Sequence, residues 1–272
     1  MGPYRLLNCI NTGQTSRLWQ AYDDRSRRFV AIKTLLDSFR KDSEQVKLLK
    51  WEFSVASKLE NERVIDIQFY GKERGIPFLV MEWFAAPNWK QRINTGLDSY
   101  TNILRDTLVG AAESIAYLNG EGWVHCDIKP DNFLVSDEGK VKLIDFALAR
   151  KAKGGFAKLI SRKSKVQGTA SYMSPEQIMG KTVDARSDVY SLACTIFECL
   201  TGRPPFTGNT ISDLLSKHIR SAPPPLVASN SNITPEMVKL IQMAMAKSPD
   251  NRPQSSIDFA KMLHNTRPLR KM

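Results

Sequence analysis

Cysteine and histidine are scarce in this chain, and the few that are present are not grouped. The 272 residues contain four cysteines and three histidines. They form no Cys-x-x-Cys pair, and no histidine lies at zinc-finger spacing from a cysteine. We therefore expect neither a disulfide framework nor a structural metal site. Reduced thiols are typical of the cytoplasm, which is the compartment that we expect.

Long hydrophobic runs are also missing. Residues 1–11 lack the basic stretch and following apolar stretch that define a signal peptide. The longest apolar segment, around 189–200, is too short to cross a bilayer. We therefore expect no membrane insertion by this chain. The sequence also shows no evident internal repeat or low-complexity tract.

Acidic residues are in the minority. Lysine and arginine outnumber aspartate and glutamate by 39 to 28, which gives a formal charge of +11 and favours anionic partners. Nucleotide, acidic peptide, nucleic acid and membrane surface all meet that condition, and composition does not choose among them. The 42% of hydrophobic residues is typical of a globular protein, and the length suits one or two lobes.

The hydrophobic pattern changes character along the chain. Up to about residue 84, short apolar runs between polar stretches and turn glycines predict a small antiparallel sheet. One helix, from about Asp42 to Asn61, is expected to interrupt it. Its apolar face would carry Val46, Leu49, Phe53, Ala56 and Leu59. After Pro87 the pattern predicts helices near 103–118, 189–200 and 237–245, and short strands at 133–135 and 141–144.

Three clusters of polar residues stand out against this background. Lys33 ends the apolar run Val30-Ala31-Ile32, and Glu52 lies nineteen positions later in the predicted helix. Alone, Lys33 is best explained as a surface lysine with an apolar stem. The other two clusters are His125-Cys126-Asp127-Ile128-Lys129-Pro130-Asp131-Asn132 and Asp145-Phe146-Ala147. All three in this order are far more specific than any one of them.

These clusters resemble the motifs of eukaryotic-type serine/threonine protein kinase domains, and the run 186–191 resembles the bacterial kind. The likeness extends to Gly168-Thr169, Ser174-Pro175-Glu176, Asp188 and Arg252. It implies an α+β, two-lobed protein kinase fold. Residues 1–84 would form an N-lobe with a small antiparallel sheet and one helix, and residues 85–272 a larger helical C-lobe with the catalytic loop and activation segment.

The resemblance also implies a reaction, in which the γ-phosphate of ATP is transferred to a protein hydroxyl with Mg²⁺ as cofactor. Asp127 would accept or orient the acceptor hydroxyl, with Lys129 near the γ-phosphate. Lys33, paired with Glu52, would hold the α- and β-phosphates. The metal ligands would be Asn132 and Asp145. Lys129 and Thr169 resemble serine/threonine rather than tyrosine kinases.

The remaining nucleotide contacts are also implied by the resemblance. Leu18, Ala31 and Leu134 would form the apolar walls of the adenine site, although any apolar core could supply such residues. Met81, Glu82 and Phe84 would belong to the connecting hinge. Asn88 matches a position that often contacts ribose, and it suits a turn equally well. By the same resemblance Glu176 and Arg252 form a structural ion pair, and Asp188 braces the catalytic loop.

The sequence departs from the family at four positions. Asn11, Gly13 and Ser16 stand where the phosphate loop has three glycines, so that two of the three are replaced, and Ala147 replaces the glycine after Asp145-Phe146. Asparagine tolerates positive φ and serine is small, so the loop can still close over phosphates. These changes motivate an alternative, a pseudokinase that acts as a nucleotide-binding scaffold. The retained catalytic residues argue against it. A nucleic-acid-binding module would rest on net charge alone, and it is not expected.

The fourth departure is Cys126, which replaces the arginine that binds an activation-loop phosphate in many relatives. A buried small residue is the simplest interpretation of Cys126, with a redox nucleophile as the alternative. The segment 146–175 carries seven basic residues and no acidic residue. Like charges should keep this segment open and solvated unless an anion gathers them, and we expect an acidic protein substrate to dock there.

Phosphorylation of this segment is expected to be dispensable, because Cys126 cannot form a charge-assisted pair with a phosphate. The test compares phosphatase-treated protein with a Ser161→Ala, Ser164→Ala double variant. Both should keep most of the parent's transfer of labelled γ-phosphate at low salt. Loss of most transfer in either preparation would contradict the prediction.

The same assay tests the docking of an acidic substrate. Transfer to an acidic acceptor should fall as ionic strength rises, because salt screens the attraction over about 10 Å at 0.1 M. Transfer that ignores salt would reject docking on the basic segment.

Overall fold

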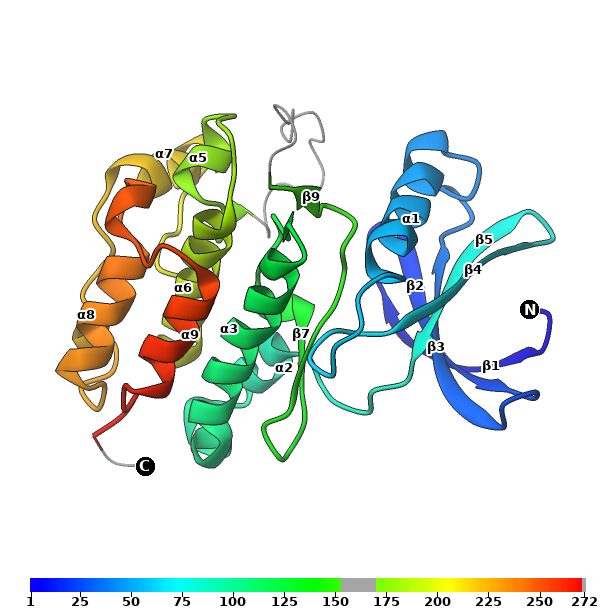
Figure 1. Ribbon diagram of the computed structural model, residues 1–272, viewed down its shortest axis with the longest axis horizontal. Coiled ribbons are helices and arrows are strands. Elements are labelled where there is room, and N and C mark those ends of the chain that lie inside the picture. The colour runs from blue at the N-terminus through cyan, green and yellow to red at the C-terminus, as the bar shows by residue number, and fades with distance from the viewer. Residues whose placement is uncertain (153–169, 271–272) are drawn as a thin grey trace. The chain divides into compact units, whose positions relative to one another are not determined.

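A computed structural model describes residues 1–152 and 170–270 (Figure 1). The chain forms two compact units. The first is Met1–Ala85 with Ile144–Leu148, and the second is Ala86–Leu143 with Ala149–Met272. A single cut in the chain therefore does not reproduce the division, because Ile144–Leu148 groups with the first unit. Residues 153–169, which include Ser161, Ser164, Gly168 and Thr169, lie outside the described part.

The first unit is an antiparallel sheet with one helix. Its strands are β1 (Tyr4–Thr12), β2 (Ser16–Asp23), β3 (Arg28–Leu35), β4 (Ile67–Glu73) and β5 (Ile76–Glu82), in the spatial order β1-β2-β3-β5-β4. Its helix, α1 (Ser43–Ala56), packs against β4 and β5 (Figure 1). Because successive strand residues point to opposite faces, one face forms a core of its own. That core consists of Ala21, Val30, Ile32, Phe78 and Val80.

Helix α1 is shorter than its sequence pattern predicted. It begins where expected, because the Asp42 side chain accepts the backbone N–H groups of Glu44 and Gln45. The predicted end at Asn61 is wrong, since the helix ends at Ala56. Asn61 instead accepts the N–H of Arg63 in a local turn at 2.8 Å. The apolar spacing continued past the helix because Leu59 is buried in the turn that follows it.

The second unit is mainly helical. Its helices are α2 (Trp89–Asn94), α3 (Leu104–Gly120), α5 (Pro175–Ile178), α6 (Ala185–Thr201), α7 (Ile211–Arg220), α8 (Pro235–Ala244) and α9 (Ser256–His264). Its strands form two short antiparallel pairs, β6 (Trp123–Val124) with β9 (Arg150–Lys151), and β7 (Phe133–Val135) with β8 (Val141–Leu143). Helix α3 packs against α6 and α9, and α8 packs against both α6 and α9 (Figure 1).

Helix α6 is the most deeply buried element of this unit, with every residue from Ser187 to Leu200 buried. Its apolar run 189–200 predicted a helix, and α6 extends beyond that run by one turn at its start and by Thr201 at its end. Helices α2, α5, α7 and α9 were not predicted, since they are short, with ten residues or fewer. Strand β8 ends at Leu143, one residue before the predicted end at Ile144.

An antiparallel sheet with one helix and a separate helical part confirm the predicted α+β class. Within the two described ranges, no helix is both long enough and apolar enough to cross a membrane.

A buried ion pair joins distant segments of the second unit. Arg252 Nη1 and Nη2 donate to Glu176 Oε1 and Oε2 at 2.8 and 2.9 Å, and Ser187 Oγ donates to Oε1 at 2.6 Å. Burial alone would raise the pKa of Glu176, but the hydrogen bonds and charge of Arg252 lower it overall. The carboxylate is therefore stable in its charged form at neutral pH.

Removing either partner should destabilise the protein strongly, because the other charge stays buried and unpaired. We expect Glu176→Gln to lower the free energy of unfolding by about 3–5 kcal/mol at pH 7, measured by urea denaturation. The carboxyl pKa is lower in the folded chain than in the unfolded one. The stabilisation is therefore present above about pH 4 and is lost below it, so parent and variant should converge in acid.

The matched control is Asp24→Asn, which removes the partner of Arg5 in a pair whose side chains are 64% and 49% exposed. That change should cost less than about 1 kcal/mol, because water screens exposed pairs. A loss at Glu176→Gln no larger than the control's would show that the buried pair is not structural.

Candidate functional site

A charged cluster lies inside the first unit around the Lys33 ammonium. Lys33 on β3 donates to Glu52 Oε2 at 2.8 Å and to Glu52 Oε1 at 3.0 Å. It also donates to Asp145 Oδ1 at 3.4 Å. Burial would lower the pKa of Lys33, but the carboxylates of Asp145 and Glu52 raise it overall. The lysine is therefore a fixed positive charge held by two predicted site residues.

Strand register brings several other predicted residues to the face of the sheet that carries Lys33. Leu18 pairs with Lys33, and Ala31 pairs with Met81 across β3 and β5. Asn11 pairs with Leu18 on β1. Directly paired residues share a face, and Ala31 lies two positions from Lys33. One face of the sheet thus carries apolar side chains next to the ammonium. The opposite face carries the hydrophobic core that contains Val30 and Ile32.

The loop between β1 and β2 closes without the backbone conformations that require glycine. The Gly13 N–H donates to the Ser16 carbonyl at 2.9 Å. Among the described residues, Asn11, Gly13 and Ser16 are not at positive φ. A Cβ on Gly13 would make only an ordinary contact, 3.5 Å from the Ser16 oxygen. The missing glycines therefore leave this turn unstrained.

The end of β5 is anchored to the segment before β4. The Glu82 N–H donates to the Asp66 carbonyl, and Glu82 Oε1 accepts the Asp66 N–H, both at 2.9 Å. Met81 is buried, while Glu82 and Phe84 are half-buried. The predicted hinge residues therefore begin in a fixed strand end.

A second polar cluster lies in the second unit around Asp127. Asp127 Oδ2 accepts from Lys129 Nζ at 2.7 Å and from Asn132 Nδ2 at 3.2 Å. Asn132 Nδ2 also donates to the Asp127 carbonyl at 2.8 Å. Asp127 Oδ1 is buried and has no hydrogen-bond partner among the described residues. The three residues that the sequence placed in a catalytic loop thus meet, and one carboxylate oxygen remains for a donor from outside.

The backbone of this loop is held by a buried carboxylate. Asp188 accepts the His125 N–H at 2.8 Å and the Cys126 N–H at 3.0 Å, and Asn119 Nδ2 donates to it at 3.0 Å. Burial raises the pKa of Asp188, although the charge of His125 and these donated hydrogen bonds oppose that effect. Cys126 has a φ of 65°, which few side chains adopt. The bonds to Asp188 hold that conformation.

Cys126 is buried at 4% exposure. Burial raises the pKa of its thiol well above the usual value. A protonated, enclosed thiol is a poor nucleophile, which supports the interpretation of Cys126 as a small buried residue.

Two other predicted contacts lie in the second unit. Leu134 on β7 pairs with Lys142 and forms a bridge with Asn88. The Asn88 side chain accepts the Gln91 N–H at 2.8 Å and caps α2. Asn88 therefore has a local structural role as the N-cap of α2.

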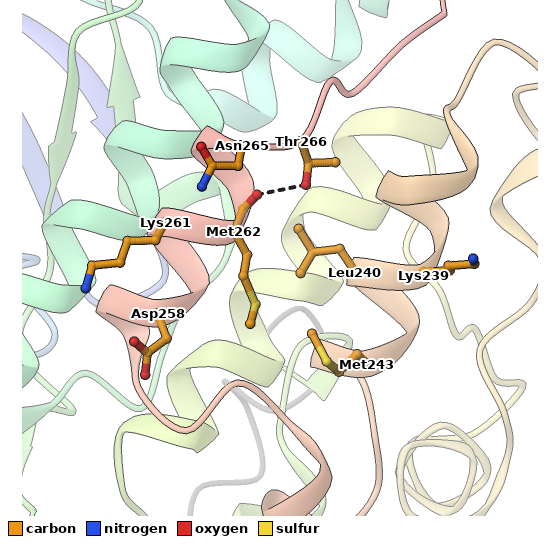
Figure 2. Close-up of a pocket in the computed structure, with 8 residues that line it drawn as sticks. All are labelled: Lys239, Leu240, Met243, Asp258, Lys261, Met262, Asn265 and Thr266. Carbon is orange, nitrogen blue, oxygen red and sulfur yellow. Dashed lines mark hydrogen bonds between the residues drawn. The ribbon is translucent and has the colours of Figure 1, made fainter.

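A groove lies between α8 and α9 (Figure 2). Its lining residues lie between positions 239 and 266, far along the chain from both clusters. Leu240, Met243 and Met262 give it an apolar floor, and Lys239 and Lys261 lie on its rim. Its described lining contains none of the predicted nucleotide, metal or catalytic residues.

Sequence reasoning missed two polar side chains next to the catalytic loop. Asn119 at the end of α3 donates to Asp188 and to the Trp123 carbonyl. Gln177 on α5 donates to the Cys126 carbonyl at 2.9 Å. Both are ordinary polar residues in helical segments, and no local pattern distinguishes them from solvent-facing ones.

Comparison with known proteins agrees with this geometry. The family model described as "Protein kinase domain" matches residues 4–265. A protein named as a probable serine/threonine-protein kinase of Streptomyces coelicolor is 33% identical, over 94% of this chain and 38% of its own length. Serine/threonine-protein kinase PknB of Mycolicibacterium smegmatis is 32% identical, over 94% of this chain and 41% of that protein.

PknB of Mycobacterium tuberculosis is 30% identical, over 97% of this chain and 43% of its own length. The chain therefore spans about two fifths of the length of these curated relatives. The resemblance stated from the motifs alone is confirmed. Since the family model covers nearly the whole sequence, the chain belongs to the protein kinase domain family.

Proposed function

We propose that this chain transfers the γ-phosphate of ATP to serine or threonine hydroxyls of proteins. The observation that carries the proposal is the Asp127 carboxylate. One of its oxygens is bound by Lys129 and Asn132, and the other is buried without a partner among the described residues. A hydroxyl donor would satisfy that second oxygen. The names of the three relatives support serine and threonine as acceptors.

The chain offers hard oxygen ligands suited to Mg²⁺. Among the described residues, both side-chain hydrogen bonds of Asn132 use Nδ2, which leaves its Oδ1 for a cation. Asp145 supplies a carboxylate beside the Lys33 ammonium. When bound, Mg²⁺ would neutralise charge on the phosphate oxygens. We assign Asn132 and Asp145 as its ligands.

The remaining residues have positioning tasks, since phosphoryl transfer needs alignment and positive charge more than covalent help. Asp127 orients the acceptor hydroxyl and accepts its proton. Lys129, fixed on the same carboxylate, supplies a positive charge for the γ-phosphate. Lys33, held by Glu52, supplies one for the α- and β-phosphates.

The nucleotide base is assigned to the apolar residues of the Lys33 face. Leu18, Ala31 and Met81 share that face by strand register. Leu134 is also proposed to contact the base. The backbone of Glu82 and Phe84 is proposed to meet the edge of the base, and the backbone of the Asn11, Gly13 and Ser16 loop to meet the phosphates.

The pseudokinase alternative loses its main support in the phosphate loop. Glycine replacement would matter most where the backbone needs positive φ, and none of the three loop positions has it. Ala147 is likewise not among the described residues at positive φ. The unsatisfied Asp127 oxygen instead favours an active enzyme.

The acceptor is proposed to be an acidic protein segment. The formal charge of +11 and the seven basic residues between 146 and 175 support this class. Opposite charge would mainly accelerate encounter and select the partner.

Replacing Asp127 should abolish transfer and spare nucleotide binding. We expect Asp127→Asn to lower kcat by about 10²–10⁴, because the amide cannot accept the hydroxyl proton. The dissociation constant for ATP should stay near the parent value, since this carboxylate serves the acceptor. Labelled phosphate transfer and calorimetric ATP titration measure the two quantities.

Asp131→Asn is the matched control, with the same charge change at an exposed position four residues later. It should keep the parent's kcat. Transfer by Asp127→Asn at the control's rate would exclude Asp127 as the proton acceptor. A parent that binds ATP and transfers nothing would favour the scaffold alternative.

Replacing Asp145 should weaken binding of nucleotide in a manner that depends on magnesium. We expect Asp145→Asn to raise the dissociation constant for ATP about ten- to hundredfold at saturating Mg²⁺, as one charged oxygen ligand is lost. Without Mg²⁺ the difference should shrink. Asp37→Asn, an exposed carboxylate of the same unit, is the control. An affinity that follows the parent's across a magnesium titration would remove Asp145 from the ligand set.

A further inference from the structure

The side chain of Gln177 connects two segments that are far apart in the sequence. Gln177 is the third residue of α5 and is only 3% exposed. Its Oε1 accepts the Ser174 N–H at 3.0 Å and the Ser174 hydroxyl at 2.9 Å. Its Nε2 donates to the Cys126 carbonyl at 2.9 Å. One amide thus completes a helix cap and also reaches the residue before Asp127.

The orientation of this amide follows from its partners. The Ser174 N–H can only donate, so it must face the amide oxygen of Gln177. The Cys126 carbonyl can only accept, so it must face the amide nitrogen. Exchanging the two atoms would break both bonds, and the link therefore has one arrangement.

The Cys126 carbonyl belongs to the peptide group that leads into Asp127. The other backbone groups nearby are already held. The His125 and Cys126 N–H groups donate to Asp188, the Asp127 carbonyl accepts from Asn132, and the Asp127 N–H makes a longer bond of 3.3 Å to His125 Nδ1. At Cys126 the φ of 65° puts a non-glycine residue in the left-handed conformation, which few side chains adopt. Such a conformation persists only where surrounding bonds enforce it. The bond from Gln177 is the one that fixes the carbonyl side.

We propose that Gln177 is a positioning residue for Asp127. By holding the Cys126 carbonyl, it sets the plane of the peptide from which the Asp127 carboxylate projects. This inference rests on the proposed function of Asp127, and it assigns to α5 the task of aiming the carboxylate.

The link is neutral on both sides. Ser174 and the first residue of α5 are the end of the basic segment 146–175, and Cys126 replaces an arginine that would need a phosphate as partner. An amide bonded to a carbonyl needs no anion. The bond between Gln177 and the catalytic loop therefore forms without a phosphate.

The decisive variant is Gln177→Glu, which replaces the side-chain NH₂ group by an oxygen and keeps the size of the side chain. A carboxylate keeps the cap, since its oxygen still accepts from Ser174. Its second oxygen faces the Cys126 carbonyl with no proton to donate. Ser174→Ala is the matched control, because it removes the hydroxyl of the cap and leaves the bond from Gln177 to Cys126.

Kinetics give the first readout. Gln177→Glu should lower kcat about tenfold or more at pH 8 with the KM for ATP within about twofold of the parent, since one hydrogen bond is lost at the catalytic peptide. As the pH falls to about 6, the introduced carboxyl gains a proton and can donate again, because burial raises its pKa. The ratio of variant to parent kcat should therefore rise. Ser174→Ala should show neither effect.

Amide hydrogen exchange gives a second readout that needs no catalysis. The Asp127 amide should exchange about tenfold faster in Gln177→Glu than in the parent at pH 8, and at the parent's rate in Ser174→Ala. Unchanged exchange, or equal exchange in both variants, would overturn the inference. So would a kcat ratio that does not respond to pH. An inactive parent with this exchange pattern would refute the proposed function and leave the positioning role of Gln177 standing.

Discussion

The carboxylate of Asp188 is the point on which the order of the catalytic loop depends. It is 1% exposed and accepts the backbone N–H groups of His125 and Cys126 together with the Asn119 amide. A buried carboxylate is costly unless donors surround it, and backbone N–H groups without a partner are also costly. Here the backbone N–H groups supply the donors that the carboxylate needs, and the carboxylate supplies the acceptor that they need. The loop can therefore hold Cys126 at positive φ and present Asp127 in one orientation.

Around this centre, the second unit fixes the loop from several directions with uncharged groups. Asn132 holds the Asp127 carbonyl, and Gln177 holds the Cys126 carbonyl. Charge is used further away, in the pair between Glu176 and Arg252 that ties α5 to the chain before α9. Because α5 carries both Glu176 and Gln177, one short helix joins the structural ion pair to the catalytic loop. A displacement of α5 would therefore change the orientation of Asp127.

The first unit holds a positive charge on a largely apolar face of its sheet. The Lys33 ammonium is balanced by Glu52 and Asp145, while Leu18 and Ala31 on the same face stay apolar. Asp145 also has positive φ, at 66°. Asp145 thus has an unusual backbone conformation itself, and Asp127 follows Cys126, which has one. Such conformations cost free energy and need neighbouring bonds to persist.

The sequence by itself determined the family, because the spacing of motifs along the chain identifies it. It also named the candidate site residues. Lys33, Glu52, Asp127, Asn132 and Asp145 could be named without coordinates, and the sheet and long helices followed from hydrophobic periodicity. Periodicity reports which residues are buried and not where a helix stops, so α1 was predicted five residues too long, ending at Asn61 and not at Ala56.

Only the tertiary structure decided which groups hold the loop. The bonds from Asp188 and Gln177 to the segment 125–126 span more than fifty residues. The role of Asp188 was known only by resemblance, and that of Gln177 not at all. A glutamine in a helix carries no local sign of its partner, because a hydrogen bond between distant segments depends on where the chain folds back and not on its neighbours in sequence.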